Sequence, residues 1–196
     1  PPRMAPVVCA IVPIYRKDEE KTLVMETVDK IVRGLGNLRV FVDRREGVTP
    51  GFKFNDWELK GVPLRIEVGP KDVQNGTLAL ARRDIPGKES KRFIPMAGFE
   101  QAVPAALAEI QTNMLAKATK FRDEHIFEVT DYDEFKDVVE NKGWAKVWWY
   151  DDAENEAKIK EETKATLRNQ AQSEGEGVCF FTGKKTNKQV YFAKGY

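Results

Sequence analysis

The sequence predicts an α/β protein in which a mixed five-stranded sheet flanked by helices is followed by a small α+β domain. Three observations support this prediction. The 196 residues leave room for one large domain or two small ones. Hydrophobic residues make up 41% of the chain, which is enough to bury a core. In the first half, apolar runs typical of strands alternate with amphipathic segments, a pattern that predicts helices packed on a sheet.

The first domain is expected over residues 1–125, and it begins with two strands and an intervening helix. Residues Val7–Ile14 form a near-continuous apolar run, as in a strand buried on both faces of a parallel sheet. Over Leu23–Leu35 apolar residues recur with a period near 3.6, which predicts a helix. Residues Leu38–Val42 are expected to form the second strand.

A second helix and three further strands complete the predicted sheet. Thr49-Pro50-Gly51 marks a helix start, because proline is favoured in a first turn, and Gly61–Pro63 ends that helix. In Leu64–Val68 the apolar residues alternate with Arg65 and Glu67, so this strand has one apolar face and one charged face. The remaining elements are strands over Thr77–Arg82 and Lys91–Ile94 and a long helix over Phe99–Met114, which Pro104 either kinks or begins.

The second domain is expected over residues 126–196 and is shorter. Its predicted elements are a helix over Asp131–Val139, a strand over Ala145–Tyr150, an acidic helix over Asp151–Glu162, a strand over Ala165–Leu167, and two strands, Val178–Phe181 and Gln189–Ala193, that pair with each other. The polar segment Gln170–Gly177 is expected to be a mobile loop.

Charge is distributed unevenly between the two domains. Residues 1–125 carry 21 Lys and Arg against 17 Asp and Glu, whereas residues 126–196 carry 11 against 14. This asymmetry suggests domains with different partners, the positive one meeting a polyanion, although ordinary solvated surface is an equal alternative. With His125 as the single histidine, a multi-histidine metal site is excluded, whereas a site of cysteine and carboxylate ligands remains open.

Two cysteines argue against a disulfide scaffold and fit a reducing compartment, so we expect a cytoplasmic protein. No apolar run reaches the roughly 18 residues of a membrane span, and no signal peptide is recognisable. The chain opens with Pro1-Pro2-Arg3-Met4, from which we expect either a processed start or a piece of a longer protein.

Motifs of catalysis are weak. There is no phosphate-binding loop of the G-x-x-x-x-G-K type, and Gly34-Leu35-Gly36 lacks the third glycine of a dinucleotide fingerprint, because Arg39 stands there. His125 is interpreted as a linker or packing residue. One alternative for the chain is an α/β domain with a small-molecule site; another is a protein-interaction module that uses the acidic second domain.

Signals of nucleic-acid recognition are stronger, because basic and aromatic residues are interleaved between positions 41 and 83. The basic set is Arg44, Arg45, Lys53, Lys60, Arg65, Lys71, Arg82 and Arg83, and the aromatic set is Phe41, Phe52, Phe54 and Trp57. Such residues bind phosphates and stack unpaired bases. Glu58 could accept hydrogen bonds from a guanine edge, and Arg65 could donate to its O6 and N7. The alternative for Phe41, Phe52 and Trp57 is a place in the core.

The run from Thr49 to Asp72 closely resembles the anticodon-binding domain of prolyl-tRNA synthetases. Further matches are Pro2–Pro6, Val12–Tyr15, Leu80–Arg83 and Val190–Tyr196, so the resemblance covers essentially the whole chain. It is to the archaeal/eukaryotic-like type, which carries an extra carboxy-terminal domain. The chain is thus similar to the carboxy-terminal part of such an enzyme, without its class II catalytic domain.

The resemblance implies a specific function. The parent would be a ligase that attaches proline to its tRNA using ATP and magnesium, whose sites lie outside this fragment. In the first domain Phe54 would stack on an anticodon base, Glu58 and Arg65 would read the edges of the anticodon guanines, and Lys71 would hold a base or a phosphate. The carboxylate of Tyr196 would reach toward the parent's active site. We expect a homodimeric parent, and a fragment that is monomeric and not itself catalytic.

One departure from the family concerns zinc. Many members bind a structural zinc through four cysteines, and the corresponding residues here are Tyr150, Asn155, Cys179 and Thr182. Because a structural zinc needs four closed ligands, we expect none. Packing would hold this domain instead, with contributions from Trp144, Trp148, Trp149, Phe180, Phe181 and Phe192.

Overall fold

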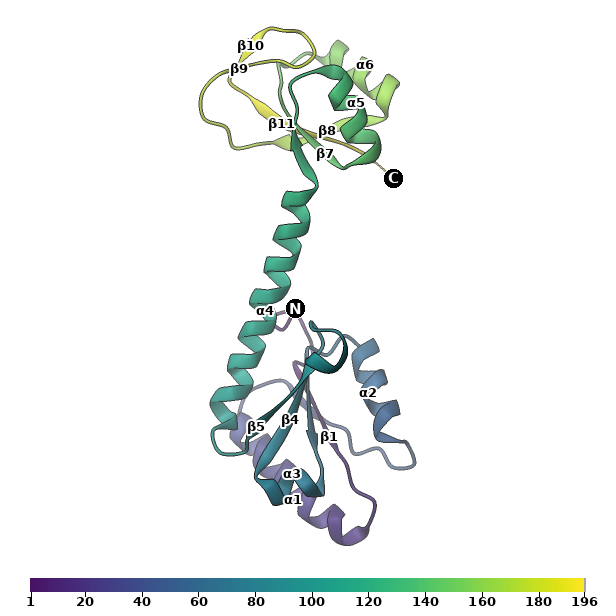
Figure 1. Ribbon diagram of the computed structural model, residues 1–196, viewed down its shortest axis with the longest axis vertical. Helices are drawn as coiled ribbons and strands as arrows, with labels where there is room; N and C mark the ends of the chain where they lie inside the picture. The colour runs from purple at the N-terminus through teal and green to yellow at the C-terminus, as the bar shows by residue number, and fades with distance from the viewer. Residues whose placement is uncertain (196) are drawn as a thin grey trace. The chain divides into compact units, whose positions relative to one another are not determined.

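The computed structural model describes residues 1–195, which form two compact units (Figure 1). Unit 1 comprises Pro1–Lys117, and unit 2 begins at Ala118. Helix α4 (Phe99–Glu124) includes the residues at which the chain passes from unit 1 to unit 2. The domain boundary that the sequence predicts after residue 125 stays a prediction. No helix within residues 1–195 is both long and apolar enough to cross a membrane.

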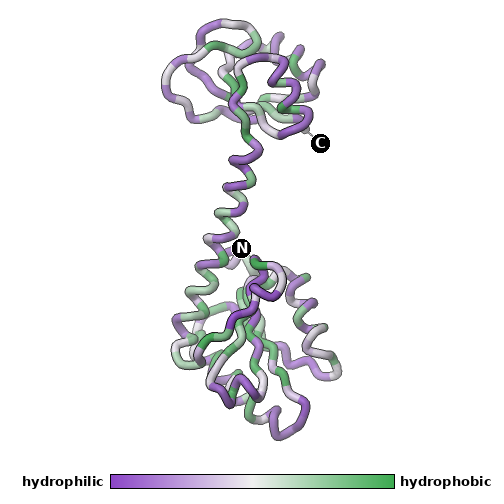
Figure 2. Tube along the Cα trace, viewed as in Figure 1, coloured by the Kyte–Doolittle hydropathy of each residue, from purple (hydrophilic) through white to green (hydrophobic). Residues whose placement is uncertain are grey.

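Unit 1 contains the predicted mixed five-stranded sheet, with strand order β2-β1-β3-β4-β5. The first three of these strands run parallel, whereas β4 is antiparallel to β3 and β5 is antiparallel to β4. The strands are β1 (Cys9–Pro13), β2 (Val40–Val42), β3 (Leu64–Val68), β4 (Thr77–Arg82) and β5 (Lys91–Pro95). The strands at the centre of this unit are coloured as hydrophobic in Figure 2, in agreement with their burial.

Helices cover both faces of this sheet. They are α1 (Asp18–Leu35), α2 (Pro50–Leu59), the short α3 (Pro70–Asn75), a 3-10 turn η1 (Gly87–Ser90) and α4. Because successive residues of a strand point to opposite sides, Leu64 and Ile66 of β3 face the core formed with α1 and α4. On the other face, Ala10 and Val12 of β1 pack against Trp57 of α2. Figure 1 shows α2 on one side of the strands and α4 on the other.

The strand order reverses at β1. The chain leaves β1 through α1 to its neighbour β2, and then returns through α2 to β3 on the opposite side of β1. In open sheets with parallel strands, such a reversal leaves a crevice beyond the carboxyl ends of the strands, between helices on opposite faces. In unit 1 the carboxyl ends of the parallel strands are at Pro13, Val42 and Val68.

Two segments of unit 1 refine the sequence predictions. The connector after Gly69, predicted only from its turn signals, folds into α3 and ends at Gly76, whose φ is 62°. Helix α4 begins at Phe99 and runs through Pro104, so Pro104 does not mark its start. A proline near the N-terminus of a helix removes at most one backbone hydrogen bond, which the buried apolar side of α4 readily offsets.

Unit 2 is built on a four-stranded sheet of order β6-β7-β11-β8. Its elements are β6 (Ile126–Glu128), α5 (Tyr132–Asn141), β7 (Trp144–Trp148), α6 (Ala153–Thr163), β8 (Ala165–Gln170) and β11 (Gln189–Lys194), with a separate ribbon of β9 (Gly177–Val178) and β10 (Lys185–Thr186). The predicted helices are confirmed. The three-residue strand β6 was not predicted, because so short a segment has no recognisable alternation.

The predicted pairing of Val178–Phe181 with Gln189–Ala193 is wrong. Strand β11 pairs antiparallel with β7 and β8, whereas β9 pairs with β10. The reason is that the chain turns after Val178, so that Phe180 enters the core instead of continuing a strand. The apolar run at 178–181 is therefore a core-filling turn.

Aromatic packing forms the core of unit 2. Phe135, Trp149 and Phe192 are almost fully buried, and the Phe135 and Trp149 rings both contact Phe192 edge-on with centroids 5.5 and 5.4 Å away. Phe180 is also buried, as predicted, but Trp144 is 41% exposed and contributes less than predicted. Phe135 was missed as a core residue because it lies on a helix whose other residues are mostly charged.

Candidate nucleic-acid interface

Helix α2 carries Phe54 and Glu58, two of the residues that the resemblance assigns to RNA binding. The helix begins at Pro50, and the Thr49 hydroxyl accepts a hydrogen bond from the backbone N–H of Phe52 at 3.3 Å. This cap satisfies one of the free N–H groups of the first turn. The start of α2 therefore follows directly from the local sequence, as predicted.

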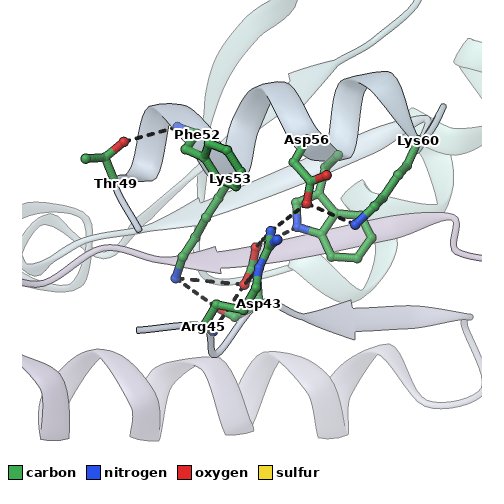
Figure 3. Close-up of polar contacts among 8 residues, drawn as sticks. Asp43, Arg45, Thr49, Phe52, Lys53, Asp56 and Lys60 are labelled. Carbon is green, nitrogen blue, oxygen red and sulfur yellow. Dashed lines mark hydrogen bonds and ion pairs between the residues drawn. The ribbon is translucent and has the colours of Figure 1, made fainter. Parts of the chain in front are cut away.

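A buried aspartate directly after β2, Asp43, anchors α2 to the sheet (Figure 3). Its Oδ2 accepts hydrogen bonds from Trp57 Nε1 at 2.8 Å and from Arg45 Nη2 at 2.7 Å. Lys53 Nζ donates to the backbone oxygen of Asp43 at 3.1 Å. Arg45 also forms an ion pair with Asp56 of α2 at 2.7 Å. Three residues of α2 are thereby tied to one loop.

The network stays charged at neutral pH. Burial would raise the pKa of Asp43, but the hydrogen bonds from Arg45 and Trp57 outweigh it and lower this pKa to about 2. The hydrogen bonds to Asp43 and Asp56 raise the pKa of Arg45. Sequence reasoning missed Asp43, because nothing in its local pattern distinguishes a buried acid from one on the surface.

Phe54 and Arg65 form a stacked pair. The guanidinium carbon of Arg65 lies 4.2 Å from the centroid of the Phe54 ring. Arg65 Nε and Nη2 donate to Glu67 Oε1 at 3.2 and 3.0 Å, and Lys91 Nζ donates to Glu67 Oε2 at 2.5 Å. Glu67 is buried, so the predicted charged face of β3 is a held ion-pair cluster rather than a solvated surface. The guanidinium plane of Arg65 is thus fixed before any ligand binds.

The same side of the sheet continues over β4 and β5 as the open sheet face. Two rows of paired residues cross its strands, namely Arg65–Ala81–Lys91 and Glu67–Ala79–Phe93. Ala79 and Ala81 of β4 have small side chains, so the surface is recessed between the larger side chains of β3 and β5. Phe93 is 63% exposed, and Lys91 Nζ lies 5.5 Å from its ring centroid. An exposed aromatic ring beside a cation is the arrangement on which unpaired bases stack.

Glu58 and Arg65 line one cleft of about 260 Å³, here called the Glu58 cleft. Arg83 also lines it, and its Nε donates to the backbone oxygen of Glu58 at 3.0 Å. Among the described residues, no ion-pair partner is found for the carboxylate of Glu58, which is exposed. The cleft therefore offers an unpaired carboxylate acceptor and guanidinium donors within one concave surface.

The remaining predicted residues are placed differently. Lys71 is exposed on α3, beyond the carboxyl end of β3, and it does not line the Glu58 cleft. Val68 ends the strand about 10 Å beyond Arg65, and Lys71 follows that end on α3. Tyr196 lies outside the described residues. The structure thus brings Phe54, Glu58 and Arg65 together and leaves Lys71 apart.

The other aromatic residues divide between core and surface. Trp57 is 8% exposed and belongs to the core, whereas Phe41 and Phe52 are 47% and 55% exposed, so the core alternative is wrong for them. Phe93 is a candidate RNA-binding residue that sequence reasoning did not single out, whereas Arg83 already belonged to the predicted basic set. Alternation in β5 could have indicated Phe93, because Ile94 takes the core side.

Comparison with known proteins decides the family. Residues 8–103 match the family model of the anticodon binding domain. Residues 132–196 match the model described as prolyl-tRNA synthetase, C-terminal. The chain belongs to the prolyl-tRNA synthetase family. The resemblance read from the sequence is thereby confirmed, for a carboxy-terminal region of the enzyme.

Individual members of the prolyl-tRNA synthetase family match along the whole chain. The proline–tRNA ligase of Chloroflexus aurantiacus is 49% identical over 199 residues, and the chloroplastic/mitochondrial proline–tRNA ligase of Arabidopsis thaliana is 41% identical over 203. The chain spans 41% and 37% of the length of these two relatives. A solved Giardia lamblia prolyl-tRNA synthetase in complex with prolyl-adenylate is 31% identical, with a TM-score of 0.91, and matches 100% of this chain and 44% of its own.

The residues at the family's zinc positions do not fit a structural zinc. Cys179 is the single thiol among them, and Tyr150, Asn155 and Thr182 supply no thiolate or imidazole. Burial would raise the pKa of Cys179, but hydrogen bonds from the Thr182 hydroxyl and the Tyr150 backbone outweigh it and lower this pKa. In the part of the chain that the structure describes, no group of three or more His, Cys, Asp or Glu side chains is placed to hold a metal ion. That this member binds no zinc stays a prediction.

His125 has a local packing contact. Its ring stacks on Phe121 with centroids 4.1 Å apart, and its Nδ1 lies 2.7 Å from the backbone oxygen of Phe121. These contacts are consistent with the interpretation of His125 as a packing residue.

Proposed function

We propose that unit 1 binds the anticodon of the tRNA for proline, as part of a ligase that attaches proline to this tRNA using ATP. The observation that carries the proposal is the Glu58 cleft, in which an unpaired carboxylate and the fixed guanidinium of Arg65 face the same space. Membership of the prolyl-tRNA synthetase family supports the identity of the RNA.

Guanine fits the chemistry of this cleft. Its N1–H and N2–H donors match the acceptor-only carboxylate of Glu58. Its O6 and N7 accept hydrogen bonds, and arginine is the side chain that most often reads them. Two of the five N–H donors of Arg65 are used by Glu67, which leaves three for a ligand. Other bases lack this combination of paired donors and acceptors.

Stacking adds affinity without adding selectivity. The ring face of Phe54 is already in contact with the Arg65 guanidinium. An anticodon base would therefore stack on the Phe54–Arg65 pair as its third layer, and a neighbouring base would use Phe93 on the open sheet face. Each such stack contributes about 1–3 kcal/mol to the binding of single-stranded nucleic acid.

The rest of the ligase completes the proposal. A class II catalytic domain would supply the ATP, magnesium and proline sites, the parent would act as a homodimer in the cytoplasm, and the Tyr196 carboxylate would reach its active site. Lys71 would contact a phosphate or base further along the RNA. Without the catalytic domain, the described chain would bind tRNA without aminoacylating it.

The test is the binding of an anticodon stem-loop with the proline anticodon to the 196-residue chain. Replacing either anticodon guanine is expected to weaken binding by about 1–3 kcal/mol. Arg65→Ala should reduce this discrimination, because it deletes the donors to guanine O6 and N7, while Glu58 still accepts from N1–H and N2–H. Arg33→Ala is the matched control, since Arg33 is exposed on α1, which packs on the opposite face of the sheet. Equal binding of every anticodon would refute the proposal.

A further inference from the structure

A second cleft of unit 1, here called the basic cleft, lies at the carboxyl edge of the parallel strands. It has a volume of about 290 Å³ and is formed by the end of β1 and the segment after it, the first turn of α1, the loop after β2 and the first turn of α2. This is the edge at which the strand order reverses around β1. Ligands of open sheets with parallel strands characteristically bind there.

The lining of the basic cleft carries an excess of positive charge. Its basic residues are Arg16, Lys17, Lys21, Arg45 and Lys53, and its acidic residues are Asp18 and Glu46. Lys21 is neutralised by Glu46 at 2.6 Å. Arg45 is bound to Asp43 and Asp56, as described above. Among the described residues, Arg16 and Lys17 have no ion pair, and Lys53 faces Asp43 only at 3.9 Å.

Two of these cations belong to the turn before α1. Among the residues that the structure describes, the side chains of Arg16 and Lys17 form no ion pair. Their backbone is nevertheless held in place, because the carboxylate of Glu20 accepts hydrogen bonds from the N–H of Arg16 at 2.8 Å and of Lys17 at 3.2 Å. These hydrogen bonds lower the pKa of Glu20, so the turn keeps its anchor at neutral pH.

The third cation is buried at the wall of the cleft. The side chain of Lys53 is 7% exposed, and Figure 3 shows it extending from α2 toward Asp43 and Arg45. Its ammonium group has three N–H donors, of which one bonds to the backbone oxygen of Asp43. The nearest carboxylate oxygen, Asp43 Oδ1, is 3.9 Å away, beyond hydrogen-bonding distance. Donor capacity therefore remains on a nearly buried ammonium beside the cleft.

We propose that the basic cleft binds a backbone phosphate of the same RNA whose guanines enter the Glu58 cleft. This inference rests on the proposed function. The two clefts lie at opposite ends of α2, because Pro50 and Lys53 line one of them and Trp57 and Glu58 line the other. Helix α2 has 10 residues and is about 15 Å long, a distance that a few nucleotides of unpaired RNA span.

The experiment compares two double variants of the 196-residue chain. Arg16→Gln with Lys17→Gln removes the two cations of the turn before α1, and Lys30→Gln with Arg33→Gln removes two exposed cations from α1 as a control. Binding of the proline anticodon stem-loop is measured between 50 and 200 mM KCl, about the range in which phosphate contacts dominate the salt dependence. A direct arm titrates each protein with inorganic phosphate and follows the backbone amide resonances of residues 14–18 by NMR.

The proposal predicts four results. The Arg16→Gln/Lys17→Gln variant binds the stem-loop more weakly than the unaltered chain. Its plot of log binding constant against log salt concentration has a slope smaller by about 0.7 for each RNA phosphate that it no longer binds. Its preference for guanine is unchanged. Phosphate shifts the resonances of residues 14–18 in the unaltered chain but not in this variant.

Other results overturn the inference. An affinity and slope equal to those of the Lys30/Arg33 control, together with resonances that phosphate does not shift, would show that the cleft binds no phosphate. Phosphate shifts without any effect on RNA binding would make it a site for free phosphate and refute the RNA contact. Failure of the unaltered chain to bind any stem-loop would refute the proposed function itself and, with it, the RNA contact.

Discussion

Replacing Asp43 with asparagine tests whether this buried carboxylate fixes α2 to the sheet. Asparagine retains an oxygen for Trp57 Nε1 but removes the charge that faces Arg45 and Lys53. Hydrogen bonds from Arg45 and Trp57 outweigh the effect of burial and lower the pKa of Asp43 from 3.8 to about 2. Relative to the unfolded chain, this shift corresponds to a preference of about 2 kcal/mol for the ionised carboxyl. We expect Asp43→Asn to lower the free energy of unfolding of unit 1 by about 2 kcal/mol at pH 7.

The sign of the pH dependence follows from the same values. Because the pKa of Asp43 is lower in the folded than in the unfolded chain, its stabilisation is present above pH 3.8 and is lost as the pH falls toward 2. The assay is urea unfolding followed by the indole N–H resonance of Trp57, the single tryptophan in residues 1–117. The difference in unfolding free energy between the two proteins should shrink as the pH falls from 4 to 2.

A matched control separates burial from charge. Asp29 forms an ion pair with Arg44 at 2.8 Å, but about half of the Asp29 side chain is exposed. Such surface pairs contribute little to stability, so Asp29→Asn should change the unfolding curve only slightly. Equal losses for the two variants, or an Asp43→Asn effect that does not vary with pH, would refute the role assigned to Asp43.

Three further predictions concern other parts of the chain. Phe93→Ala should weaken stem-loop binding by about 1–3 kcal/mol, as measured by fluorescence anisotropy. Because the Phe93 ring is largely exposed, the melting temperature should not fall. Unchanged binding would show that Phe93 is not part of the interface. Gly177→Ala should destabilise unit 2 by about 1–3 kcal/mol in thermal unfolding, because a Cβ there would overlap the indole of Trp148. As a control, the Cβ added by Gly51→Ala on α2 meets no atom within 4 Å, so this variant should be neutral or stabilising. A Gly177→Ala protein as stable as the unaltered chain would contradict this packing. Protein purified without added zinc should contain no zinc by inductively coupled plasma mass spectrometry, because Cys179 is the single thiol at the family's zinc positions. About one equivalent of zinc per chain would contradict that expectation.

Periodicity predicted most of the fold. The apolar run of β1, the amphipathic pattern of α1 and the proline start of α2 each reflect local physics, so the sequence alone places these elements. The pairing of β11 could not be predicted in the same way, because β9 and β11 are both short and apolar. What decides their pairing is the turn that takes Phe180 into the aromatic core, a tertiary effect.

The candidate site was only partly predictable for a similar reason. Alternation in β3 places Arg65 on the face of the sheet that points away from the core formed with α1 and α4. It cannot show that Glu67 is buried or that Phe54 stacks on the guanidinium of Arg65. The two rows across β3, β4 and β5 depend on strand register, which the sequence of one strand does not contain. Phe93 was therefore missed although its strand was predicted.

The most direct test of the central claim is the affinity of the 196-residue chain for the proline anticodon stem-loop, compared with stem-loops in which each anticodon guanine is replaced in turn. We expect a loss of about 1–3 kcal/mol for each replacement in the unaltered chain, and in Arg65→Ala a smaller loss at the guanine that Arg65 contacts. Equal affinity for all stem-loops in the unaltered chain would contradict the central claim.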